Sequence, residues 1–178
     1  QTGTGKTAAF GLPLLQCVDP RNKFPLALVV CPTRELCMQI AQDMNRFRDP
    51  QKGHHILPVY GGAPITGQIK DLKKGASIVV ATPGRLIDLI ERKAIDLQEI
   101  KWVVLDEADE MLNMGFQEDI EFILKNTPER ESLWLFSATM PTEIRKVTKR
   151  YMESPVEVTV GVANSGNANI DHHYYSCQ

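Results

Sequence analysis

Five short apolar runs are each followed at once by a polar or glycine cluster, and this arrangement constrains the fold more than any other feature. The runs lie at residues 26–31, 56–60, 77–81, 102–105 and 133–136, with a further apolar run at 156–160. Helix-like patterns fill the gaps, at residues 6–17, 34–47, 66–74, 85–92, 116–126 and 143–152. Runs that are almost entirely apolar are typical of parallel strands covered on both faces. The alternation therefore predicts an α/β fold with a doubly wound, mostly parallel sheet and helices on both faces.

The clusters that follow the apolar runs contain the side chains suited to binding or catalysis. They are Pro32-Thr33-Arg34, Gly61-Gly62, Thr82-Pro83-Gly84-Arg85, Asp106-Glu107-Ala108-Asp109 and Ser137-Ala138-Thr139. Sheets of this kind bind their ligands at the carboxyl ends of the strands. We therefore expect the five clusters to meet at one edge of the sheet and to form the functional site there.

The chain opens with most of a phosphate-binding loop. Its first residues, Gln1-Thr2-Gly3-Thr4-Gly5-Lys6-Thr7, match the pattern GxxxxGK[ST] from its second position onward. The chain is therefore expected to begin inside the motif. Backbone N–H groups of such a loop bind phosphate oxygens, Lys6 is predicted to meet the β- and γ-phosphates, and Thr7 to hold Mg²⁺. A glycine-rich terminal segment that leads into a helix cap is the alternative interpretation.

Two acidic residues follow the apolar run at 102–105. Asp106 fits the position that holds Mg²⁺, and Glu107 would face the water that attacks the γ-phosphate. Acidic residues before a helix also act as an N-terminal cap, which is the alternative interpretation of this cluster alone. That alternative leaves the phosphate loop unexplained. The two features together predict hydrolysis of a nucleoside triphosphate.

Composition narrows the class further. The 178 residues suit one domain, and the apolar share of 43% is ordinary for a globular protein. A net charge of −2 argues against a broad basic surface that binds nucleic acid. Any contact with nucleic acid would therefore be local and made by a few loops. No run approaches the roughly 18 apolar residues of a membrane helix, and no signal peptide is visible.

Neither the cysteines nor the two adjacent histidine pairs show metal-ligand spacing. We expect a cytoplasmic protein with reduced thiols at Cys17, Cys31, Cys37 and Cys177.

The five clusters, in this order and at these spacings, resemble the motif series of DEAD-box RNA helicases. The resemblance extends from residue 1 to about residue 160 and is greatest to the bacterial cold-shock and ribosome-assembly members. It implies the first RecA-like domain of such an enzyme, with the P-loop NTPase fold and with ATP and Mg²⁺ as cofactors. Residues 161–178 would form a linker toward a second RecA-like domain. That domain, the adenine-reading motif and the strand entering the phosphate loop are expected outside this chain, so that the domain alone would be nearly inactive.

The resemblance also implies a role for each motif residue. The triphosphate would be bound by Thr2, Gly3, Thr4, Gly5, Lys6 and Thr7. Asp106 would hold the metal, Glu107 would position water and Asp109 would link the nucleotide site to the neighbouring motifs. Ser137 and Thr139 would couple hydrolysis to strand separation. The sugar-phosphate backbone of one RNA strand, whatever its sequence, would be contacted by Pro32, Thr33, Arg34, Gly61, Gly62, Thr82, Gly84 and Arg85.

Purely structural roles are the alternative interpretation of these predicted RNA-binding residues. Arg34 and Arg85 could form helix-start ion pairs, and Gly61-Gly62 could be a plain turn. Trp102 and Trp134 lie on strand patterns and are expected in the core rather than stacked on bases.

Three functions are consistent with the sequence. The leading hypothesis is the ATP-binding domain of an ATP-dependent RNA helicase. The alternatives are a RecA-like module that binds RNA or a partner without hydrolysis, and a relative that translocates on DNA. The intact Lys6, Thr7, Asp106 and Glu107 favour an enzyme.

Overall fold

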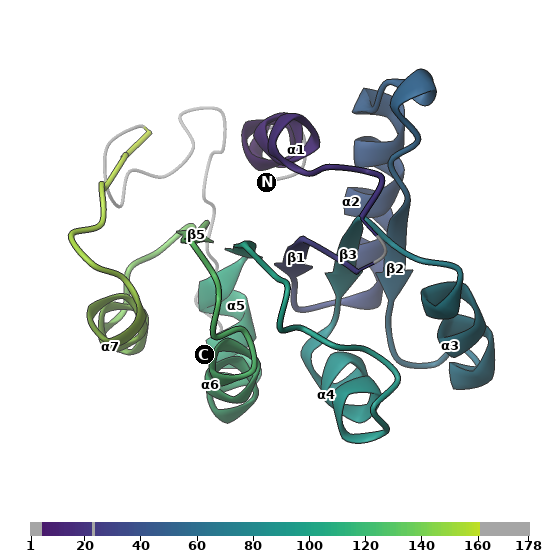
Figure 1. The fold of residues 1–178 in the computed structure, drawn as a ribbon. Coiled ribbons are helices and arrows are strands. Elements are labelled where there is room, and N and C mark those ends of the chain that lie inside the picture. Colours follow the sequence, from purple (N-terminus) through teal and green to yellow (C-terminus); the bar gives the residue numbers. More distant parts are fainter. Residues whose placement is uncertain (1–4, 23, 161–178) are drawn as a thin grey trace, which may run out of the picture.

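The structure is a computed structural model, and it describes residues 5–22 and 24–160. The predictions for Thr2, Gly3, Thr4 and the linker at 161–178 fall outside the described residues. Five parallel strands form one sheet in the order β2-β3-β1-β4-β5 (Figure 1). The strands are β1 (Ala27–Val30), β2 (Ile56–Val59), β3 (Ile78–Ala81), β4 (Trp102–Leu105) and β5 (Ser132–Leu135). The predicted parallel α/β sheet is therefore confirmed.

The strands end level with one another. Val30 at the end of β1 lies opposite both Ala81 and Leu105, the last residues of β3 and β4. Val59 pairs with Ala81 at the end of β2, and Leu105 pairs with Leu135 at the end of β5. Because all five carboxyl ends share one edge, every polar cluster that follows a strand begins at that edge.

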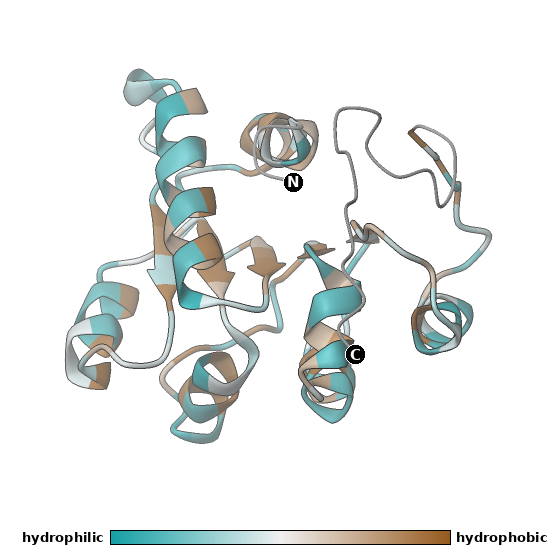
Figure 2. Ribbon diagram, turned by 180° about the vertical axis from the view of Figure 1, so that it is seen from behind, coloured by the Kyte–Doolittle hydropathy of each residue, from teal (hydrophilic) through white to brown (hydrophobic). Residues whose placement is uncertain are grey.

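Helices cover both faces of the sheet, as Figures 1 and 2 show from opposite sides. Side chains alternate along each strand, so that Leu28 and Val30 of β1 enter one apolar cluster while Ala27 and Val29 enter the other. The second cluster is covered by α1 (Lys6–Cys17) and α2 (Arg34–Phe47). The first is covered by α3 (Ile65–Lys73), α4 (Pro83–Glu91), α5 (Ala108–Asn113), α6 (Gln117–Lys125) and α7 (Thr142–Tyr151).

Local sequence explains how α1 and α2 pack. The Thr33 hydroxyl accepts a hydrogen bond from the Leu36 N–H at 3.3 Å and so caps the start of α2. Buried residues then recur on one side of α2, at Cys37, Ile40, Ala41 and Met44. Gly11 lets α1 approach this side closely, since a Cβ at that position would lie 3.3 Å from the Met44 Cγ.

The predicted elements agree with the structure except at three places. The helix α5 and a short 3₁₀ helix, η1 (Pro50–Lys52), were not predicted. The predicted strand at 156–160 is wrong, because no strand of the described chain pairs with it. Its alternating valines are almost fully exposed, at 89, 80 and 96% for Val156, Val158 and Val160. Alternation alone does not make a strand when no ladder of hydrogen bonds is available.

The thiols of Cys17, Cys31 and Cys37 are free, as expected, whereas Cys177 and the histidine pair at 172–173 fall outside the described residues. Cys31 and Cys37 are fully buried in the second cluster. His54 is buried too, and its Nε2 lies 3.1 Å from the Val18 carbonyl oxygen. Trp102 and Trp134 are partly buried and pack against the second cluster, at the margin of the core where they were expected.

Within the part of the chain that the structure describes, none of the helices has the length and apolar character needed to cross a membrane.

Candidate functional site

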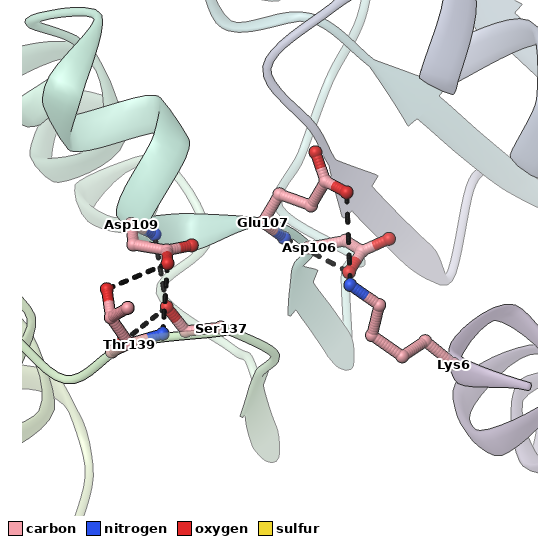
Figure 3. Close-up of polar contacts among 6 residues, drawn as sticks. All are labelled: Lys6, Asp106, Glu107, Asp109, Ser137 and Thr139. Carbon is pink, nitrogen blue, oxygen red and sulfur yellow. Dashed lines mark hydrogen bonds and ion pairs between the residues drawn. The ribbon is translucent and has the colours of Figure 1, made fainter. Parts of the chain in front are cut away.

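The start of α1 faces the end of β4. Gly5 precedes the helix in the left-handed conformation, with φ of 77°, which glycine adopts without a steric penalty. Lys6 is the first helical residue, and its Nζ lies 3.8 Å from Oε1 of Glu107 (Figure 3). Lys6 and the paired acids, a hundred residues apart in sequence, are thus brought together, with Thr7 one residue further into the helix. The amino end of α1 also offers backbone N–H groups and a positive dipole to an anion.

Asp106 is the buried member of the acidic pair, with 2% of its surface exposed. Its N–H donates to the Val30 carbonyl at 2.9 Å, and its Oδ1 accepts from the Glu107 N–H at 3.0 Å. Burial raises the pKa of Asp106, and the Glu107 charge raises it further, while the Lys6 ammonium opposes both effects. A desolvated carboxylate that gains from a nearby positive charge fits a hard cation with oxygen ligands, such as Mg²⁺.

Glu107 has an unusual backbone. Its φ of 52° and ψ of 49° place it in the left-handed region, where a residue with a Cβ is strained by about 1–2 kcal/mol. As a result of this turn the two carboxylates have different environments. Asp106 is buried, whereas the Glu107 side chain is 37% exposed beside Lys6. Such strain is concentrated at functional sites, where the surrounding structure maintains it.

A second polar network lies beside the acidic pair (Figure 3). Asp109 Oδ2 accepts from the Thr139 N–H at 3.0 Å and from its hydroxyl at 2.8 Å. The Ser137 hydroxyl accepts from the Asp109 N–H at 3.2 Å and donates to the Thr139 carbonyl at 2.7 Å. Burial raises the pKa of Asp109, but the hydrogen bonds that Thr139 donates to its carboxylate, with the Ser137 hydroxyl close by, outweigh burial and leave that pKa below its ordinary value. The start of α5 is therefore tied to the segment that follows β5.

A cavity of about 430 Å³ opens further along the same edge of the sheet. Six of the eight residues predicted to contact RNA line it, namely Pro32, Arg34, Gly61, Thr82, Gly84 and Arg85. Phe116 also lines it and was not predicted. The only sequence signal for Phe116 is its place directly after Gly115 and before α6. A cleft of similar size, about 420 Å³, lies around residues 15–21, 52 and 54 and contains none of the predicted site residues.

The predicted RNA-binding side chains differ in what they already contact. The Arg34 guanidinium lies 5.1 Å from the centre of the Tyr60 ring. Arg85 donates to the Ala63 carbonyl and to the Gln68 side chain. Among the residues that the structure describes, neither arginine forms the helix-start ion pair that was the alternative.

Of the other residues predicted to contact RNA, two precede helices and one lies in a turn. Thr33 uses its hydroxyl to cap α2, whereas Thr82 begins α4 without a side-chain cap. Gly62 lies in the turn after β2, with φ of 83°.

Comparisons with known proteins agree with this geometry. A family model described as DEAD/DEAH box helicase matches residues 1–147. The ATP-dependent RNA helicase DeaD of Mycobacterium tuberculosis is 48% identical over 174 residues, which are 98% of this chain and 31% of that protein. The DEAD-box ATP-dependent RNA helicase CshA of Streptococcus pneumoniae is 51% identical over 174 residues, which are 98% of this chain and 33% of that protein.

A solved structure resembles the fold closely. The crystal structure of the yeast DEAD-box splicing factor Prp28 superposes with a TM-score of 0.86 at 32% identity, over 93% of this chain and 42% of that one. Relative to the DeaD and CshA helicases, the chain spans about a third of the length of the curated relatives it matches.

Proposed function

Because this chain belongs to the DEAD/DEAH box helicase family, we propose that it supplies the ATP-binding RecA-like domain of an ATP-dependent RNA helicase. One observation carries the proposal: Lys6, at the start of α1, meets Asp106 and Glu107 at the end of β4. The bacterial relatives named ATP-dependent RNA helicases support the assignment. The domain would extend to about residue 160, and the rest of the chain would lead to a second RecA-like domain.

The described residues suit hydrolysis of ATP. Lys6 and the amino end of α1 would hold the phosphates, and Asp106 with Thr7 would hold Mg²⁺. Mg²⁺, when bound, neutralises phosphate charge. Glu107, which is partly exposed beside Lys6, would orient the water for in-line attack on the γ-phosphate. Positioning and charge stabilisation would supply most of the catalysis.

The RNA role is supported by the cavity at the same edge. Exposed backbone at Gly61 and Gly84 and the guanidinium of Arg34 are groups that suit phosphate oxygens and do not read base identity. The network of Asp109, Ser137 and Thr139 lies between α5 and the segment after β5. We propose that it transmits the state of the nucleotide site to that segment.

RNA-stimulated ATP hydrolysis tests this function, in a protein that carries this chain followed by a second RecA-like domain. We expect RNA to stimulate turnover and Lys6→Ala to abolish it. RNA binding without turnover would favour the module that only binds. Equal stimulation by DNA of the same length would favour the DNA-translocating relative. For the 178-residue chain alone we expect almost no turnover, and its cytoplasmic location stays a prediction.

A further inference from the structure

Gln68 on α3 is a buried polar side chain that no motif explains. It is only 8% exposed, and both ends of its amide are hydrogen-bonded. Nε2 donates to the Tyr60 carbonyl at 3.1 Å, and Oε1 accepts from Nη1 of Arg85 at 2.9 Å. An amide is costly to bury unless its groups are bonded in this way. Gln68 therefore joins α3, the end of β2 and the start of α4.

The guanidinium of Arg85 is largely committed to the protein itself. Nη1 and Nη2 each donate to the Ala63 carbonyl at 3.1 Å, in addition to the bond from Nη1 to Gln68. Three of the five N–H groups of a guanidinium are thus used. Arg85 lines the cavity, yet these N–H groups bind Ala63 in the loop before α3 and Gln68 on α3, and are not directed to a ligand.

These contacts hold the Gly61-Gly62 turn at both of its ends. Gln68 binds the carbonyl of Tyr60, just before the turn, and Arg85 binds the carbonyl of Ala63, just after it. Inside the turn, Gly62 has a positive φ of 83°, and a Cβ there would lie 3.3 Å from Nη1 of Arg34. The turn is therefore held from both ends and lies against the Arg34 side chain.

We infer that Gln68 is a positioning residue for RNA binding, which acts with Arg85 to hold the backbone of the Gly61-Gly62 turn ready for a phosphodiester. The inference rests on the proposed RNA role of this edge. Preorganisation raises affinity because less conformational freedom is lost when the ligand binds. The occupant is the sugar-phosphate backbone of a single RNA strand, and Gln68 touches it only through the turn.

The inference is tested by the binding of a labelled ten-nucleotide oligouridine, measured by fluorescence anisotropy, to a protein that carries this chain followed by a second RecA-like domain. Gln68→Leu keeps the volume but removes both hydrogen bonds, and RNA affinity should fall about tenfold. Gln68→Glu keeps the acceptor for Arg85 but places a carboxylate oxygen against the Tyr60 carbonyl oxygen, so RNA affinity should fall although Arg85 stays bonded. Gln98→Leu is the matched control, since Gln98 is exposed before β4, at the opposite edge of the sheet.

Two readouts separate positioning from a general loss of structure. In Gln68→Leu, hydrogen exchange should quicken at the helical amides of α3, which Gln68 joins to the turn, and stay unchanged in β1 and β4. Binding of a fluorescent ATP analogue should match that of Gln98→Leu. Unchanged RNA affinity in Gln68→Leu, or equal loss of RNA and nucleotide affinity, would overturn the positioning role while the proposed function stands. Failure of the unaltered two-domain protein to bind the oligouridine would overturn both.

Discussion

At the scale of single residues, Glu107 combines a strained backbone with a partly exposed carboxylate beside Lys6. If Glu107 orients the attacking water, Glu107→Gln should keep the turn and the size of the side chain but remove the general base. We expect ATP turnover to fall at least about a hundredfold, with nucleotide affinity changed little. Steady-state ATPase assays and binding titrations of the two-domain protein measure both quantities. Turnover equal to that of the unaltered protein would remove Glu107 from the mechanism.

The Gly61-Gly62 turn offers a matched pair at the same scale. Gly62→Ala places a Cβ at positive φ and 3.3 Å from the Arg34 guanidinium, whereas a Cβ at Gly61 meets nothing within 4 Å. Gly62→Ala should therefore lower the free energy of unfolding by about 1–2 kcal/mol, and Gly61→Ala should change it far less. Urea denaturation distinguishes them. Equal effects would mean that the conformation of the turn is not constrained at Gly62.

The sequence was sufficient to predict that Lys6, Asp106 and the strand-end clusters gather at one edge of the sheet, because each has a fixed place relative to a strand or a helix start. It was not sufficient for Gln68 or Phe116. Gln68 matters through bonds to residues 60 and 85, which only the folded chain brings together. Phe116 lines the cavity from the short segment between α5, an element that was not predicted, and α6.

At the scale of elements, two threonines begin helices in different ways. The Thr33 hydroxyl caps α2, whereas that of Thr82 makes no cap hydrogen bond at α4. Thr33→Ala should cost about 1 kcal/mol of stability, and Thr82→Ala should cost much less. Thermal and denaturant unfolding of both variants provide the comparison. The interpretation of the caps is wrong if Thr82→Ala proves the more destabilising of the two.

Long periodic elements were easier to predict than short ones. The bounds of α1, α2 and β4 match their predicted ranges, because apolar spacing and flanking polar residues both mark the ends. The helix α5 has only six residues, too few for a 3.6-residue period to be visible. The run at 156–160 alternates as a strand does, yet pairing depends on a neighbouring strand and not on the run itself.

At the scale of the whole molecule, the core should depend on the central sheet and not on the segment after α7. Leu28 of β1 is fully buried in the first cluster, whereas Val158 is 80% exposed. Leu28→Ala should lower the free energy of unfolding by about 2–5 kcal/mol, and Val158→Ala should stay within about 0.5 kcal/mol of the unaltered chain. Chemical denaturation measures both. A large loss in Val158→Ala would show that this segment packs after all.

The central claim is that a lysine at a helix start and a buried aspartate act on one magnesium-bound triphosphate. Binding of a fluorescent ATP analogue to the 178-residue chain, titrated with Mg²⁺ and then with EDTA, tests it most directly. We predict weak, magnesium-dependent binding that falls at least about tenfold in Lys6→Ala, as expected for loss of a charge-assisted contact. In Asp106→Asn the magnesium dependence should largely disappear. Affinity that is the same in all three proteins and indifferent to EDTA would contradict the account.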